Sequence, residues 1–305
     1  MSLRALHDLP APAKLNLFLH VTGRRADGYH LLQSLFVLID WADQIHLERR
    51  ADGRLLRHDI GPGLPADDLC LKAARALQHA SGCQWGADIH LDKRVPWGAG
   101  LGGGSSDAAT VLLGLNRLWG LNWPRQRLLA LGLTLGADVP FFLGGRNAIV
   151  EGIGEILHPV DLQPLHFHVV KPPASAETAK IFSHPLVTRN TSPAIVEGLL
   201  QSIALGGVAG PAGTAINKWH VMWGRNDLQC ATEALCPEVK IAAKTLDRLH
   251  GNARMSGSGS AVFSAVPESV ASKQVAVSNS GLWPDGWVEC WCRSLTRHPL
   301  EAWST

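Results

Sequence analysis

Between residues 96 and 107 the chain reads Pro96-Trp97-Gly98-Ala99-Gly100-Leu101-Gly102-Gly103-Gly104-Ser105-Ser106-Asp107. Five of the seven residues from 98 to 104 are glycine, and apolar residues at helical spacing follow them. Glycines let a backbone approach a polyphosphate and turn several N–H groups toward it. The N-terminus of the following helix adds unpaired donors and the positive end of its dipole. The stretch therefore predicts a phosphate-binding loop at residues 96–106, because a turn without a ligand would not need so many glycines.

The neighbours of this loop argue against three other classes that use glycine loops. A P-loop NTPase carries Lys and then Ser or Thr after the last glycine, whereas Ser105 follows Gly104 and no lysine occurs between Lys93 and Lys171. A dinucleotide-dependent oxidoreductase would match the G-x-G-x-x-G spacing, but it needs an acidic residue about 20 positions onward to bind the ribose. The H-R-D and D-F-G signatures of protein kinases are absent as well.

Two charged residues outside the loop are candidates for the chemistry. Asp138 lies between a helix stop at Gly136 and an apolar segment that Pro140 initiates, so we expect it to cap a short helix and stay ionised. Such a carboxylate can orient or deprotonate an alcohol. Lys14 and Asn16 are two residues apart and share one face of a predicted strand; beside Asp138, Lys14 would keep the carboxylate charged. A plain helix cap and a solvated strand lysine are the alternatives.

A second loop of small residues precedes a predicted strand and consists of Ser256, Gly257, Ser258, Gly259 and Ser260. Its glycines and hydroxyl groups suit close packing beside a bound phosphate or substrate. An ordinary turn would have the same composition.

Apolar periodicity predicts helices and strands in both halves of the chain. In the first half we expect strands at 13–21, 31–40 and 87–93, and helices at 69–81, 108–119 and 124–136. In the second half we expect strands at 166–171, 253–255 and 261–266, and helices at 227–235 and 237–250. A turn region at 152–159 places the boundary near residue 163, which gives domains 1–163 and 164–305. Because helices and strands are mixed in both halves, we expect an α+β fold. The tryptophan-rich residues after Val266 fit no predicted element.

The composition of the chain limits the kinds of partner that the protein is expected to bind. With 28 basic and 26 acidic residues the net charge is +2, so nothing draws the whole chain to nucleic acid or an anionic membrane. Arg4, Asp8 and Lys14 interrupt the N-terminal region where a signal peptide would need an apolar run. The longest uncharged run, 198–217, carries five glycines, and we expect a loop-rich segment rather than a membrane span. Six scattered cysteines fit packing residues of a cytoplasmic protein.

Three blocks in this order resemble the three motifs of the GHMP kinase superfamily, the group of galactokinase, homoserine kinase, mevalonate kinase and phosphomevalonate kinase. The blocks are Pro12-Ala13-Lys14-Leu15-Asn16, the loop at 96–107 and the loop at 256–260. The stretches Gly23 to His30 and Leu135 to Phe142 resemble one branch only, the kinases acting on 4-diphosphocytidyl-2-C-methyl-D-erythritol in the non-mevalonate isoprenoid pathway.

The resemblance implies a two-domain α+β GHMP kinase fold. Its N-terminal domain would be like ribosomal protein S5, its C-terminal domain ferredoxin-like, and the active site would lie in the cleft between them. The implied reaction transfers a phosphoryl group from ATP to the 2-hydroxyl of the cytidine-diphosphate methylerythritol. Asp138 would be the general base with Lys14 as its charged neighbour, and residues 96–106 would hold the ATP. Mg²⁺ would be bound through the ATP phosphates, with no dedicated protein ligands.

For the acceptor, the resemblance implies that Tyr29 and Phe182 sandwich the cytosine ring, which is sensible chemistry for a pyrimidine. His30 would read the polar edge of the ring, and Asn16 and Thr178 would line the substrate site.

Alternatives at this point are another GHMP kinase, with homoserine, mevalonate or a sugar as acceptor, and a non-catalytic nucleotide-binding protein with the same fold. Trp97 stands where many members have Met, and Ser258 where many have Thr. The sequence leaves open whether the protein forms a homodimer.

Overall fold

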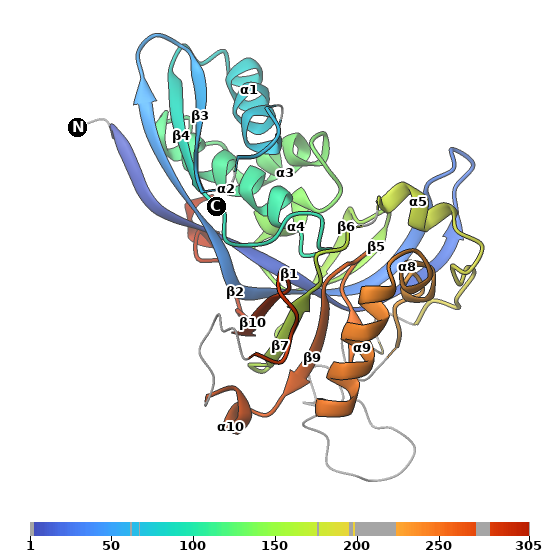
Figure 1. The fold of residues 1–305 in the computed structure, drawn as a ribbon. Helices are drawn as coiled ribbons and strands as arrows, with labels where there is room; N and C mark the ends of the chain where they lie inside the picture. Colours follow the sequence, from blue (N-terminus) through green and yellow to red (C-terminus); the bar gives the residue numbers. More distant parts are fainter. Residues whose placement is uncertain are drawn as a thin grey trace.

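The computed structural model describes residues 3–61, 63–66, 68–175, 177–194, 198, 224–272 and 281–304. Apart from Gly198, the uncharged run predicted to be loop-rich lies outside the described residues. Within the described ranges, no helix is both long and apolar enough to cross a membrane. Two sheets and the helices that cover them make up the molecule (Figure 1).

In the part of the chain that the structure describes, the first sheet has six strands with the order β3-β4-β2-β5-β6, and β1 pairs with β2. The strands are β1 (Ala5–Arg24), β2 (His30–Arg50), β3 (Leu55–Ile60), β4 (Gly86–Asp92), β5 (Ala148–Gly152) and β6 (Ile156–Pro159). Neighbours are antiparallel except β3 and β4, which are parallel. The predicted turn region at 152–159 is therefore partly wrong, because its second half forms β6 and pairs with β5.

The strands β1 and β2 are 20 and 21 residues long, slightly more than twice the predicted lengths. Register shifts at four points along the β1–β2 pair mark bulges, which bend a long hairpin without ending it. As a result β1 enters three separate apolar cores, first with Leu9, then with Leu15 and finally with Val21. The hairpin thus connects both halves of the molecule.

Four helices cover one face of the first sheet (Figure 1). They are α1 (Leu69–Ser81), α2 (Gly103–Leu118), α3 (Arg125–Leu133) and α4 (Val139–Gly144). The α1 helix matches its prediction, since the side chain of Asp68 accepts a hydrogen bond from Leu71 N and Gly82 closes the helix with a φ of 67°. The α3 helix ends at Leu133, earlier than the expected stop at Gly136.

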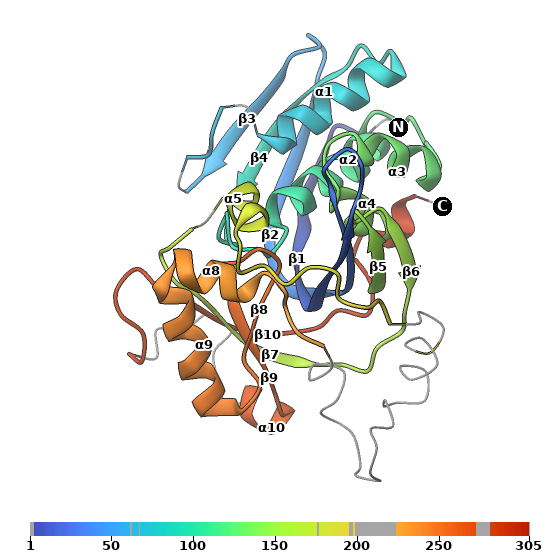
Figure 2. The same cartoon turned by 90° about the vertical axis from the view of Figure 1, so that its right-hand side faces the viewer.

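The second sheet has the order β10-β7-β9-β8 and is antiparallel throughout. Its strands are β7 (His166–Lys171), β8 (Arg254–Met255), β9 (Val262–Val266) and β10 (Val288–Arg293). Its helices are α5 (Thr178–Ser183), α8 (Gln229–Leu235), α9 (Pro237–His250) and α10 (Glu268–Ala271). The apolar face of α9 packs on β7 and β9, and α5 and α8 lie toward the first half (Figure 2). The residues that fitted no predicted element thus contain an edge strand, β10.

Candidate active site

Three segments far apart in the sequence are joined by hydrogen bonds where the two halves of the molecule meet. They are the β1 segment around Lys14, the glycine loop after β4 and the loop 256–260 between β8 and β9. The bonds are Lys14 N to Leu101 O at 2.9 Å, Asn16 N to Ser256 Oγ at 3.2 Å, Ser256 Oγ to Gly100 O at 2.9 Å and Ala261 N to Ala99 O at 3.0 Å. The structure therefore brings together the three blocks that the sequence singled out.

Two glycines of the loop allow this close packing. Gly100 has a φ of 73°, and a Cβ there would lie 2.1 Å from the carbonyl oxygen of Ser256. Gly102 has a φ of 70°, and a Cβ there would lie 2.9 Å from the ring of Phe142 and 3.1 Å from Cγ of Lys14. Both positions exclude a side chain through conformation and through space.

The predicted loop divides into two parts. Gly98, Gly100 and Gly102 have positive φ values and form the turn, whereas the residues from Gly103 onward form the first turns of α2. The helix thus begins five residues earlier than expected, because glycine also adopts helical φ and ψ. No side chain caps the N-terminus of α2, which leaves its first N–H groups without that partner. Trp97 is exposed, at 70%.

Lys14 and Asp138 form an ion pair with 3.6 Å between Nζ and Oδ2. The Lys14 side chain is buried, donates to Asn16 Oδ1 and lies 4.5 Å from the centre of the Phe36 ring. The amide of Asn16 is oriented by a 3.0 Å bond from Nδ2 to Ser34 Oγ. Burial lowers the pKa of Lys14, and the charge of Asp138 opposes that shift. The pair is thus a buried cation facing a carboxylate that stays 30% exposed.

Asp138 lies directly before α4, as predicted, but the expected capping bond is absent among the described contacts. Its φ and ψ of −83° and −16° are already helical, so its side chain does not point back along the helix. Pro140, at the start of α4, also lacks an N–H for a cap to bind. The carboxylate therefore faces Lys14 instead of the helix end.

The aromatic residues predicted around the acceptor are arranged differently from the expectation. His30 and Phe182 stack on each other, with ring centres 5.0 Å apart and planes 25° apart. Tyr29 is 62% exposed, because it follows Gly28 in the turn at the tip of the β1–β2 hairpin. Burial and the charges of Arg189 and Arg24 lower the pKa of His30, which favours its neutral form. The structure thus joins two of the three predicted residues.

The loop between β8 and β9 is held from two sides. Thr178 Oγ1 and Ser258 Oγ are 2.9 Å apart, so the predicted substrate residue on α5 contacts the third motif. Asn226 Nδ2 donates to Met255 O and Gly257 O, each at 2.8 Å. These contacts hold the loop against α5 and against the segment that precedes α8.

A buried ion cluster under the glycine loop was missed by the sequence reasoning. Lys93 Nζ lies 2.5 Å from Asp43 Oδ2 and 2.6 Å from Asp107 Oδ2. Asp43 Oδ1 also accepts bonds from the backbone N–H groups of Arg94 and Val95. Burial raises the pKa of Asp107 well above its usual range. The cluster connects both ends of the loop, and the only signal for it was a charged residue at each end.

Comparisons with known proteins agree with this arrangement. Two family models match, GHMP kinases N terminal domain at residues 68–146 and GHMP kinases C terminal at residues 203–282. A 4-diphosphocytidyl-2-C-methyl-D-erythritol kinase of Methylibium petroleiphilum is 57% identical, with 100% of both chains covered. The enzyme of that name from Paracidovorax citrulli is 51% identical, with 99% of both chains covered.

Solved structures give the same result. A crystal structure of 4-(cytidine 5'-diphospho)-2C-methyl-D-erythritol kinase has a TM-score of 0.68 and 39% identity, covering 85% of this chain and 89% of that one. Homoserine kinase from Cytophaga hutchinsonii also has a TM-score of 0.68, but at 17% identity over 97% and 96% of the two chains it supports the fold alone. Full-length identity above one half, two GHMP models and the convergence of the three motifs lead to one assignment: the chain belongs to the 4-diphosphocytidyl-2-C-methyl-D-erythritol kinase family of the GHMP kinases.

Proposed function

We propose that this protein transfers the γ-phosphoryl group of ATP to the 2-hydroxyl of 4-diphosphocytidyl-2-C-methyl-D-erythritol, giving the 2-phosphate and ADP in the non-mevalonate isoprenoid pathway. The names of the full-length relatives support this acceptor over homoserine or mevalonate. The observation that carries the mechanism is the 3.6 Å pair of Lys14 and Asp138 directly beside the glycine loop.

The ATP phosphates are bound by the main chain of residues 96–106 and by the N-terminus of α2. Support comes from the uncapped N-terminus of this 16-residue helix and from the three positive-φ glycines that precede it. Free N–H groups and the helix dipole favour an anion at such a position.

Asp138 accepts the proton of the attacking hydroxyl or orients that hydroxyl toward the γ-phosphorus. Phosphoryl transfer has a loose transition state, so alignment and charge neutralisation carry most of the catalysis. Lys14 serves both purposes, because its buried ammonium group lies 3.6 Å from the Asp138 carboxylate and its backbone N–H donates to Leu101 O of the loop.

Mg²⁺ would be held through the ATP that the glycine loop binds. The sequence supports this proposal, because residues 96–106 contain no carboxylate. When bound, the ion neutralises charge on the phosphates.

The acceptor is bound by Asn16, Tyr29, His30, Thr178 and Phe182. A neutral His30 offers one donor and one acceptor, which suits the polar edge of cytosine. The ring of Phe182, which faces His30, supplies a stacking surface.

The domain division near residue 163, a homodimer and a cytoplasmic location are also proposals. The start of β7 at His166 supports the first. Light scattering of the purified protein would test the second.

The decisive experiment compares Asp138→Asn with the wild-type protein in an ADP-release assay with MgATP and the cytidine-diphosphate methylerythritol. We expect kcat to fall by about 10² or more, the usual size of a general-base contribution, without loss of the fold. Asp161→Asn is the control, because Asp161 is an exposed aspartate that pairs with Arg146. Unchanged kcat in Asp138→Asn would refute the role, and turnover with homoserine or mevalonate alone would refute the acceptor.

A further inference from the structure

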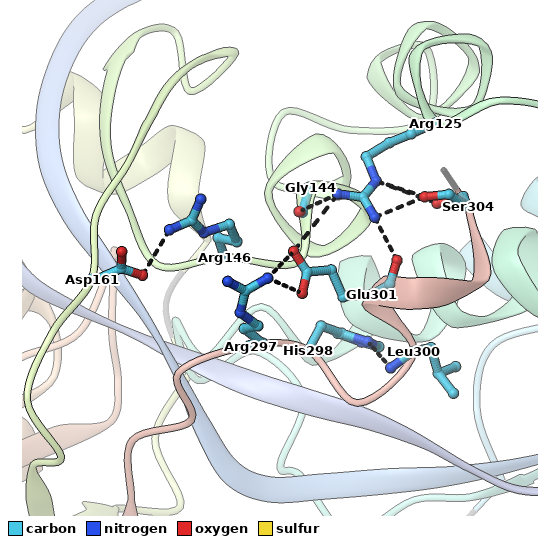
Figure 3. Close-up of polar contacts among 9 residues, drawn as sticks. All are labelled: Arg125, Gly144, Arg146, Asp161, Arg297, His298, Leu300, Glu301 and Ser304. Atoms are coloured by element: carbon cyan, nitrogen blue, oxygen red, sulfur yellow. Dashed lines mark hydrogen bonds and ion pairs between the residues drawn. The ribbon is translucent and has the colours of Figure 1, made fainter.

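After β10 the chain returns to the first half of the molecule. Residues 294–304, here called the C-terminal strap, run beside α4 (Figure 3). Leu295 N donates to Leu38 O at 2.8 Å, and Leu300 is buried in the same apolar core as Phe141 of α4. The strap is therefore a packed part of the first half.

Arg125, the first residue of α3, links the strap to α4 (Figure 3). Its guanidinium group donates to Gly144 O at 3.3 Å, to Ser304 O at 2.8 Å and to Glu301 O. Gly144 is the last residue of α4, so its carbonyl has no acceptor role within the helix. Because the five donors of an arginine lie in one rigid plane, this side chain joins the helix end to two points of the strap.

The residue after α4 is enclosed by the strap as well. Gly145 has a φ of 73°, and a Cβ there would lie 3.0 Å from Cγ of Glu301. The carbonyl of Gly145 accepts a bond from His298 N at 2.8 Å. The Glu301 carboxylate is held in turn by Arg297 at 3.0 Å and by Arg125 at 3.8 Å. The C-terminal end of α4 thus has little freedom to move.

The opposite end of α4 carries Asp138. With six residues the helix is about 9 Å long, since each residue adds about 1.5 Å. Phe141 and Phe142 are fully buried, so the helix packs as one stiff unit. Asp138 directly precedes α4, and its carboxylate lies 3.6 Å from Lys14 Nζ, so a displacement of the helix would change this distance.

We propose that the C-terminal strap, acting through Arg125 and Glu301, holds α4 in place and thereby positions Asp138 for phosphoryl transfer. The inference rests on the proposed role of Asp138. Arg125 and Glu301 are positioning residues, because their contacts are to α4 and the strap and not to the reacting groups.

The test is the steady-state kinetics of Arg125→Met, with Arg146→Met as the matched control. Arg146 lies beside the strap, but its side chain pairs with Asp161 at 2.7 Å and not with α4 (Figure 3). A displacement of about 1 Å can cost up to about 10²-fold, so we expect kcat to fall at least about tenfold in Arg125→Met. The KM values for ATP and acceptor should stay within about threefold, because only the transition-state alignment is lost. Arg146→Met should keep the wild-type kcat.

Two further variants separate positioning from stability. Arg125→Lys keeps the charge and one donor, and it should recover part of the lost kcat. In the Asp138→Asn background, Arg125→Met should cause little further loss, because both changes disable the same group.

Three results would overturn the inference. They are an unchanged kcat in Arg125→Met, an equal loss in both backgrounds, and a loss that follows unfolding in circular dichroism at the assay temperature. If Asp138→Asn lowers kcat and Arg125→Met does not, the strap inference alone fails. If Asp138→Asn keeps full turnover, the proposed base and the strap inference both fail.

Discussion

Replacing Gly100 by alanine tests how closely the glycine loop and the 256–260 loop depend on each other. A non-glycine residue at a φ of 73° costs about 1–2 kcal/mol. In addition, the new Cβ would lie 2.1 Å from Ser256 O, so the loops must separate and the bond from Ser256 Oγ to Gly100 O breaks. Loss of that partly buried bond costs a further ~0.5–1.5 kcal/mol. We therefore expect Gly100→Ala to lower the free energy of unfolding by about 1.5–3.5 kcal/mol.

The matched control is Gly82→Ala at the end of α1. Its φ of 67° is nearly the same, but a Cβ there meets nothing within 4 Å. In urea unfolding, Gly82→Ala should lower the free energy of unfolding by the backbone cost alone, and Gly100→Ala should lower it by more. Initial rates should give a raised KM for ATP in Gly100→Ala only, because only that change moves the phosphate loop. Equal stability losses together with an unchanged KM for ATP would refute the reasoning.

Three other changes have clear expected results. Lys14→Met should lower kcat by about 10² or more at saturating ATP, since it removes the cation facing Asp138; single-turnover rates equal to wild type would contradict this. Phe182→Ala should raise the KM for the acceptor about 5- to 100-fold, the equivalent of one lost base stack, and leave the KM for ATP unchanged. Acid should weaken the fold through His168, whose pKa burial lowers from its ordinary 6.5 to about 4 despite the nearby Glu289. Below a pH of about 6.5 the unfolded imidazole binds a proton, whereas the folded imidazole binds one only near pH 4. The urea concentration at the unfolding midpoint should therefore decrease as the pH is lowered from about 7.5 to about 5. A midpoint that does not change with pH, or one that decreases by the same amount in His168→Gln, would count against this.

Features encoded locally were predictable from the sequence. The N-cap Asp68 and the C-cap Gly82 define both ends of α1 within one short stretch of sequence. The glycine loop was predictable from its composition. The membership of Lys14 and Ser256 in one site was predictable only from the resemblance to a family, because 242 residues separate them.

Features that depend on distant partners were not predictable. The bulges in β1 and β2 conceal their true lengths, because each shift changes which face the next residues occupy. The bond from Arg125 to Ser304 spans 179 residues, and an isolated arginine gives no sign of it. For Asp138 the expected neighbour Lys14 is confirmed, but the expected helix cap is wrong, since its backbone is already helical and Pro140 lacks an N–H.

The return of the chain through β10 to α4 affects protein synthesis. The ribosome makes residues 288–304 after all the other described residues, so the outer edge of β7 and the end of α4 stay uncovered until these residues have been made. An uncovered strand edge readily pairs with other chains. Chains that end before residue 288 should therefore aggregate, because they lack the strand that covers this edge.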